Sequence, residues 1–234
     1  MTPVSPQARR LRAYERWLAR PSLGSIASRW AMSPMGVFLT SSPLFRLPES
    51  LQLTSSLRVL EIGTGRGALL RMLDSRLRLD HPLTGIDLST QPLRLAQRDE
   101  QRAGGSLRLA RASGTALPFA DGSFDLVLCG HHIRQLDDPE LIELLREIRR
   151  TLAEGGLAVI WDFALTGNGT LDRWNARVLA SGGKSPRLRS TQALLQAADL
   201  AGFEFARDAR LRPFLLPPIP RASILIGRPP SGAT

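Results

Sequence analysis

From residue 57 onward, the hydrophobic positions of the chain change back and forth between two spacings. Short apolar runs of strand length occupy residues 57–62, 83–86, 124–129 and 157–163, and residues 106–111 alternate as a strand would. Between several of these runs, over residues 68–77 and 92–102, apolar residues recur every three or four positions, which is the spacing of one helix face. Strands that alternate with helices in this way predict a parallel sheet with helices on both faces.

A further helix is expected to begin at the Asp-Asp-Pro-Glu sequence of residues 137–140, because acidic capping residues and a proline suit a first helical turn. The pair Gly155-Gly156 would stop this helix. Its buried stripe would be Leu141, Leu145, Ile148 and Leu152.

The last part of the chain follows a different order of elements. Residues 190–202 read as a helix that Ser190 opens and Gly202 closes. Strand-like runs at 203–209 and 222–226 are joined by a proline-rich loop, residues 213–220, and not by a helix, which favours an antiparallel pair at one edge. The expected fold is therefore α/β: a doubly wound seven-stranded sheet, mostly parallel, with an antiparallel edge pair.

Residues 1–56 lack this regular alternation. Residues 7–20 predict an amphipathic helix with Leu11, Tyr14 and Leu18 along one face, and Pro21 ends it. The apolar, proline-punctuated segment that follows is expected to pack on the main domain. We therefore divide the chain into an N-terminal helical extension or lid, residues 1–56, and a main domain, residues 57–234.

The composition is that of a soluble globular protein, with 43% hydrophobic and 22% charged residues. No run approaches the ~20 apolar residues that a membrane-spanning helix needs. No apolar block of a secretory signal follows the arginine-rich start, so we expect a cytoplasmic location. The single cysteine, Cys129, lies in an apolar run and is expected to be a buried, inert thiol.

The formal net charge is +10, and Lys184 is the only lysine, so almost all the cations are arginines. These arginines are spread along the chain, which favours a solvated basic surface. The alternative is an anionic partner: nucleic acid, a phospholipid surface or an acidic substrate. One local concentration lies on the first predicted helix, at Arg9, Arg10, Arg12, Arg16 and Arg20.

A glycine-rich turn follows the first strand, at the edge of the sheet where doubly wound folds bind ligands. Gly63, Gly65 and Gly67 form G-x-G-x-G, whose third glycine comes one residue too early for a dinucleotide fingerprint. Glu61 precedes the turn and Asp87 ends the next strand. An acid at that second position can accept hydrogen bonds from ribose hydroxyls, and an acid beside the turn suits a cationic amino group. A sulfonium amino acid joined to adenosine meets both requirements.

Two motifs resemble a known family. Residues 61–67 (EIGTGRG) look like the nucleotide-binding motif of class I S-adenosylmethionine-dependent methyltransferases. Residues 117–127 (LPFADGSFDLV) and 144–160 resemble signatures of the methyltransferase-11 and ubiquinone/menaquinone C-methyltransferase-like branch. The resemblance covers about residues 57–163. It implies a Rossmann-like fold, S-adenosylmethionine as cofactor and S-adenosylhomocysteine as product.

The resemblance also implies a role for individual residues. The glycine turn, with Thr64, would pass beneath the methionine part, Glu61 would orient nearby polar groups, and Asp87 would hold the ribose. Ser113 stands where the branch often has an acid that bonds adenine. The remaining implied cofactor contacts are Leu88, Gly114, Thr115, Cys129 and Gly130.

His131 and His132 follow the fourth strand, close to where the branch often has a His pair, although they are displaced toward the strand. Either one could act as a general base, because a histidine titrates near neutral pH. The alternative is that His131 only ends the strand and packs on the cofactor. With so few histidines, no metal site is expected.

The implied reaction transfers a methyl group to an O, N or C nucleophile of a small, hydrophobic molecule: a quinone, lipid or secondary metabolite. The substrate pocket would be built from residues 1–56 and 164–190, and its candidate aromatic residues are Trp17, Trp30, Phe38, Phe45, Trp161, Phe163 and Trp174. The basic charge leaves two alternatives, an RNA methyltransferase and a non-enzymatic cofactor-binding or membrane-surface protein led by the arginine-rich first helix. No pattern in the sequence indicates an oligomeric state.

Overall fold

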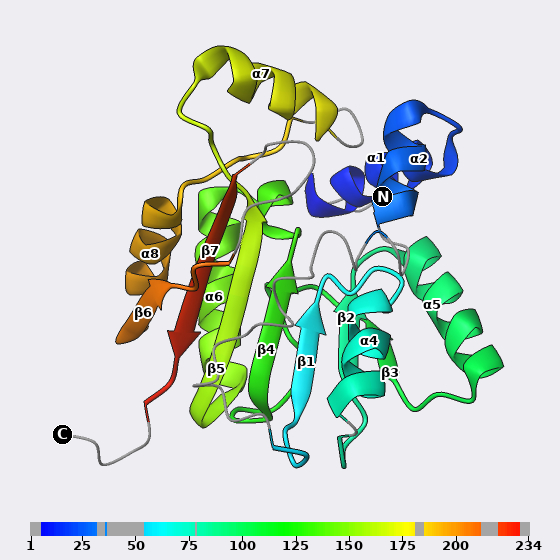
Figure 1. Ribbon diagram of the computed structural model, residues 1–234, viewed down its shortest axis with the longest axis vertical. Helices are drawn as coiled ribbons and strands as arrows, with labels where there is room; N and C mark the ends of the chain where they lie inside the picture. The colour runs from blue at the N-terminus through cyan, green and yellow to red at the C-terminus, as the bar shows by residue number, and fades with distance from the viewer. Residues whose placement is uncertain are drawn as a thin grey trace, which may run out of the picture.

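The computed structural model describes residues 6–31, 36, 54–77, 79–180, 185–211 and 220–229. Seven strands form one sheet in the order β3-β2-β1-β4-β5-β7-β6 (Figure 1). The strands are β1 (Val59–Ile62), β2 (Thr84–Asp87), β3 (Arg108–Arg111), β4 (Phe124–Gly130), β5 (Leu152–Phe163), β6 (Phe205–Asp208) and β7 (Arg221–Gly227).

The strand pairing confirms the expected architecture. The first five strands pair in parallel, and β7 pairs antiparallel with both β5 and β6. The strand order reverses between β1 and β4, where Ile62 is in register with Ile86 on one side and Cys129 on the other. In a doubly wound sheet, this reversal is the place where a ligand-binding crevice forms.

Helices cover both faces of the sheet (Figure 1). The helices of the main domain are α4 (Ala68–Leu77), α5 (Thr90–Ala103), α6 (Asp138–Thr151), α7 (Gly169–Val178) and α8 (Thr191–Leu200), with a 3₁₀ turn η2 (Ile133–Gln135). One core cluster buries apolar residues of α6 and α8 against the sheet, and a second cluster buries those of α4. Each face therefore has its own apolar layer, as a parallel sheet requires.

Helix α6 begins as expected and ends earlier than expected. Asp137 and Glu140 form a reciprocal capping box, with a proline in the first turn. The helix ends at Thr151, so the prediction that Gly155-Gly156 stops it is wrong. Leu152 instead starts β5, where it is wholly buried opposite Phe124. Pairing with β4 outweighs the helical spacing of that leucine.

The N-terminal extension contains α1 (Pro6–Ala19) and α2 (Leu23–Ala31), which lie at the carboxyl end of the sheet (Figure 1). Helix α7 lies at the same end, in a region to which the sequence pattern assigned no element. None of the described helices is both long and apolar enough to cross a membrane. Residues 213–219 of the loop predicted at 213–220, and the candidate aromatic residues Phe38 and Phe45, lie outside the described residues.

Candidate active site

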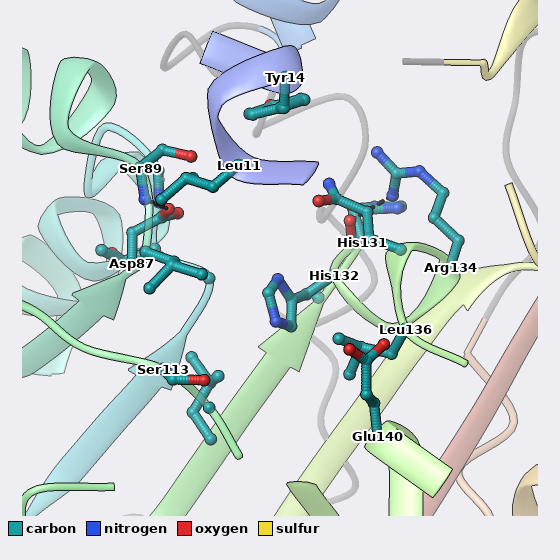
Figure 2. A pocket seen from close by; sticks show the side chains of 18 of the residues that line it. Leu11, Tyr14, Asp87, Ser89, Ser113, His131, His132, Arg134, Leu136 and Glu140 are labelled. Atoms are coloured by element: carbon teal, nitrogen blue, oxygen red, sulfur yellow. Dashed lines mark hydrogen bonds between the residues drawn. The ribbon is translucent and has the colours of Figure 1, made fainter. Parts of the chain in front are cut away.

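A cavity of about 540 Å³ opens at the carboxyl end of the sheet, at the reversal of strand order. Figure 2 shows its two sides, with Tyr14 of α1 above them. One side carries Asp87, Ser89 and Ser113, and the other carries His131, Arg134 and Glu140. Every cofactor residue implied by the sequence motifs lines this cavity except Gly67 and Cys129.

The glycine turn lies against a histidine. Gly63 and Gly65 have φ angles of +77° and +53°, which favour glycine. A Cβ at Gly63 would also lie only 3.0 Å from the His132 side chain, so this position has no room for one. Gly67 has a positive φ too but does not line the cavity, so its role is in the turn itself.

Cys129 corrects an expectation from the sequence. Its side chain is wholly buried in the core cluster beside α6, and only its neighbour Gly130 reaches the cavity. Successive residues of a strand point to opposite faces, so the two cannot share one side. Burial raises the pKa of the Cys129 thiol, which keeps it protonated and inert.

Asp87 ends β2 and is held by the backbone on both carboxylate oxygens. Oδ2 accepts a hydrogen bond from the Gly65 N–H at 2.9 Å, and Oδ1 accepts one from the Ser89 N–H at 2.7 Å. Each carboxylate oxygen can accept more than one hydrogen bond. Asp87 therefore faces the cavity in a fixed position with capacity left for a pair of ligand hydroxyls.

Glu61 is a buried acid beside the glycine turn. It is 6% exposed, and its Oε2 accepts a hydrogen bond of 2.6 Å from the Thr64 hydroxyl. Burial raises its pKa to about 8, and the nearby Asp87 adds to the effect. A cation bound in the cavity would reverse this shift, because it favours the charged carboxylate.

The segment of residues 113–115 forms a small polar loop at the cavity wall. The Ser113 and Thr115 hydroxyls are hydrogen bonded at 2.9 Å, and the Thr115 N–H donates to Ser113 Oγ. Gly114 packs closely on Leu144 and Ile62, which would each lie about 3 Å or less from a Cβ. This packing fixes the loop, so that hydroxyls stand where the related branch often has an acid.

The two histidines face different parts of the cavity. His132 lies over Gly63, and His131 has its Nδ1 3.7 Å from Asp162 Oδ1 and its ring 4.8 Å from that of Phe163. Burial lowers the pKa of both imidazoles below the ordinary value, although nearby acids partly oppose the effect. Both rings are therefore neutral at pH 7. His131 also has a φ of +55°, which is uncommon for a residue with a side chain.

Behind His131 lies an ion pair that was not predicted from the sequence. Asp162 Oδ1 is 3.0 Å from the Arg134 guanidinium, and its Oδ2 accepts the Arg134 N–H at 2.9 Å. Burial opposes ionisation of Asp162, but Arg134 and His131 outweigh it and hold its pKa below the ordinary value. The one feature of the sequence that could have predicted this ion pair is the acid Asp162, which lies within the otherwise apolar run of β5.

Helix α1 closes one side of the cavity. Glu15 Oε1 accepts the N–H of Thr90, at the start of α5, and so ties the extension to the main domain. Leu11 and Tyr14 line the cavity, and burial raises the pKa of Tyr14 to about 12. The sequence pattern placed both on the inner face of this helix without identifying them as site residues.

The predicted aromatic pocket is correct only in part. Trp161 and Phe163 line the cavity, whereas Trp17 does not. Trp30 and Trp174 are about half exposed and lie outside it. No group of three or more potential metal ligands occurs in the described part of the chain.

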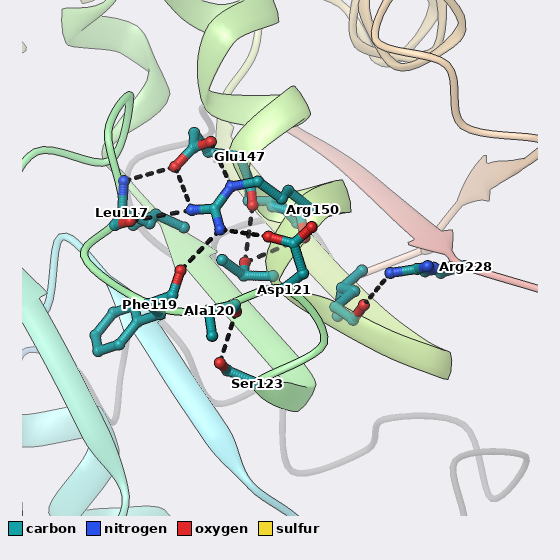
Figure 3. A network of polar contacts seen from close by, with 11 residues as sticks. Leu117, Phe119, Ala120, Asp121, Ser123, Glu147, Arg150 and Arg228 are labelled. Atoms are coloured by element: carbon teal, nitrogen blue, oxygen red, sulfur yellow. Dashed lines mark hydrogen bonds and ion pairs between the residues drawn. The ribbon is translucent and has the colours of Figure 1, made fainter.

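The signature at residues 117–127 has a structural role, which Figure 3 shows. The Arg150 guanidinium of α6 donates to the carbonyls of Leu117 and Phe119 and pairs with Asp121 at 2.8 Å. Glu147 accepts the Leu117 N–H and also pairs with Arg150. The network holds the loop before β4 on α6 and so fixes the start of that strand, at the end opposite to the two histidines.

Comparison with known proteins agrees with this geometry. A family model described as "Methyltransferase domain" matches residues 59–156. A curated relative from Mycolicibacterium smegmatis, named provisionally as an O-methyltransferase, is 32% identical over 171 residues, covering 71% of each chain. Demethylmenaquinone methyltransferase of Thermus thermophilus is 36% identical over 106 residues, which are 45% of this chain and 47% of the relative. The chain thus spans about half the length of the menaquinone enzyme it matches.

A solved structure shows the same fold at low identity. The apo form of the S-adenosylmethionine-dependent methyltransferase SibL superposes with a TM-score of 0.69 and 19% identity, over 92% of this chain and 62% of that one. The protein therefore belongs to the class I S-adenosylmethionine-dependent methyltransferases, a family whose cofactor is S-adenosylmethionine.

Proposed function

We propose that the protein transfers the methyl group of S-adenosylmethionine to an O, N or C nucleophile of a small, hydrophobic molecule such as a quinone, a lipid or a secondary metabolite. The observation that carries this proposal is the division of the cavity. Its one side bears the acids Glu61 and Asp87, and its other side bears Trp161, Phe163 and His131. The names of the Thermus and Mycolicibacterium relatives support quinone-type and O-linked acceptors.

The acidic side suits the cofactor. The remaining lone pairs of Asp87 would accept the ribose hydroxyls, and the loop of residues 113–115 with Leu88 would border the adenine. Glu61, protonated at neutral pH in the free protein, would ionise beside a bound cation. The positive charge of the ligand would then balance the negative charge of the ionised Glu61 carboxylate.

The two histidines would then have separate roles. When bound, S-adenosylmethionine supplies an electrophilic methyl group on a sulfonium. Neutral His132, over Gly63, would contact that region without charge repulsion. His131 would accept the proton of an acceptor hydroxyl or related group, as a general base.

Asp162 and Arg134 would act on the reaction through His131. The Asp162 carboxylate would orient the imidazole and stabilise its protonated form, while Arg134 keeps Asp162 ionised. Asp162 does not line the cavity, so it is a positioning residue. Residues 1–56 would serve as a lid, with Tyr14 and Leu11 excluding water from the reacting groups.

The test combines cofactor binding with methyl transfer. Wild-type protein should bind labelled S-adenosylmethionine and label members of a panel of hydroxylated quinones and phenols. Asp87→Ala should lose binding, whereas His131→Asn should bind the cofactor and lose transfer. Phe205→Ser, an exposed change on the far edge strand, is the matched control and should keep both. Unchanged cofactor binding in Asp87→Ala would reject this placement of the site.

A further inference from the structure

Two helices at the carboxyl end of the sheet present large apolar side chains to solvent. On α2, Ile26 and Trp30 are each 50% exposed and lie one turn apart. On α7, Leu171, Trp174 and Val178 are 37%, 48% and 50% exposed and follow the spacing of one helix face. We call these five residues the apolar surface.

This clustering is unusual for a soluble domain. The described residues include eight exposed large hydrophobic side chains, and these two helices carry five of them. Single exposed apolar residues are ordinary, but a concentration of them at one end of a molecule marks an interaction site. We therefore expect the apolar surface to bind a partner that can bury aliphatic and indole side chains.

The same end of the molecule is strongly basic. Arg9, Arg12 and Arg16 of α1, and Arg20 directly after it, repeat every three or four positions and are all exposed. None of the four forms an ion pair with a carboxylate of the described residues. On α7, Arg173 and Arg177 are also exposed and flank the apolar stripe. The partner should therefore be anionic as well as able to bury apolar groups.

We propose that α1, α2 and α7 form a docking surface for the face of an anionic lipid bilayer. Arginines beside exposed Trp, Leu, Ile and Val residues are the combination by which helices bind at a lipid interface, with the apolar groups among the acyl chains and the cations at the headgroups. An RNA would pair with the arginines and stack on Trp30 or Trp174, but it would not bury the exposed aliphatic side chains.

The proposed docking surface adjoins the cavity. Arg9 and Leu11 of α1 and Ser28 of α2 line the cavity on one side, and Ser185 to Arg187, which follow α7 in the chain, line it on another. Because these elements line the cavity, a bilayer bound on this surface would lie beside it. This last step rests on the proposed function, because it would let a lipophilic acceptor enter directly from the membrane.

The test is sedimentation of the full chain with vesicles, without cofactor or acceptor, so that it is independent of methyl transfer. We expect binding to phosphatidylcholine vesicles that contain phosphatidylglycerol, little binding to pure phosphatidylcholine, and loss of binding at high salt. A basic residue at an anionic surface contributes about fivefold to binding. Arg12→Glu/Arg16→Glu should therefore weaken binding by about twentyfold or more.

Two matched controls separate the surface from net charge and from general hydrophobicity. Arg98→Glu/Arg102→Glu makes the same charge change at exposed positions of α5, and Phe205→Ser removes an exposed aromatic residue from β6. Both should bind vesicles nearly as wild type does, whereas Trp30→Ser/Trp174→Ser should not. Thermal unfolding of each variant checks that it is folded.

Three results would overturn the proposal. The first is an absence of binding to anionic vesicles at low salt. The second is an equal loss in Arg98→Glu/Arg102→Glu and Arg12→Glu/Arg16→Glu, which would leave only a net-charge effect. The third is tRNA binding that depends on the α1 arginines but not on Trp30 and Trp174, with no vesicle binding, which would assign the basic surface to nucleic acid.

Discussion

Glu61 provides a prediction that links the fold to the cofactor, because a buried acid with a raised pKa changes stability with pH in a defined direction. Its pKa is about 8 in the folded protein and ordinarily 4.5. Between these values the folded protein holds more protons than the unfolded chain, so its stability falls as pH rises. The difference corresponds to at most about 5 kcal/mol, reached above pH 8.

The substitution Glu61→Gln removes the ionisation and keeps an oxygen that can accept the Thr64 hydroxyl. In the free protein, this variant should become more stable than wild type at pH 8 and about equal to it at pH 5, as measured by denaturant unfolding. Its gain at pH 8 should amount to a few kcal/mol. The exposed acid Glu143 on α6 gives the control Glu143→Gln, which should leave the pH dependence unchanged.

Cofactor binding should release the proton that Glu61 holds. At pH 7.5 the free protein carries roughly three quarters of a proton there, and a bound cation favours the carboxylate. Calorimetric titration with S-adenosylmethionine in buffers of different ionisation enthalpy measures the number released. The slope of the observed binding enthalpy against the buffer ionisation enthalpy should be the same for wild type and Glu143→Gln. It should be lost in Glu61→Gln. An identical slope in all three proteins would refute the role given to Glu61.

Four further substitutions test other residues of the site and of the fold. Asp87→Asn should weaken cofactor binding about tenfold or more by calorimetry, since the amide nitrogen cannot accept a hydrogen bond. Gly63→Ala should cost about 1–2 kcal/mol in denaturant unfolding, because its φ is positive and His132 leaves no room. His131→Asn, which tolerates a positive φ, should slow transfer about a hundredfold or more. It should also abolish the loss of wild-type activity that we expect at acidic pH, where the His131 imidazole, whose pKa burial lowers from its ordinary value, becomes protonated. Arg150→Ala should cost about 2–3 kcal/mol by releasing the loop before β4, whereas Arg146→Ala, exposed on the same helix, should change stability by less than about 0.5 kcal/mol.

Local signals predicted most of the fold because they agree with the tertiary structure. The Asp137–Glu140 capping box started α6 where expected, and the proline-rich run predicted as a loop between the last two strands correctly indicated their antiparallel pairing. Helix α7 could not be predicted in this way. Its apolar residues Leu171, Trp174 and Val178 face solvent, so their spacing does not mark a core.

The cofactor side of the site was predictable because its residues follow strand ends within short motifs. The pairing of His131 with Asp162 was not, since it joins residues far apart in the sequence through the register of Gly130 with Trp161. Cys129 was misplaced because the sequence does not say which face of β4 each residue joins. Side-chain direction within a buried strand is set by its neighbours in the sheet.

The most direct test of the central claim is a crystal structure with S-adenosylhomocysteine. We expect the ribose hydroxyls on Asp87, the adenine beside residues 113–115, and the sulfur near Gly130 and His132 with His131 on the open side. A ligand bound elsewhere, or one with its ribose away from Asp87, would contradict that claim.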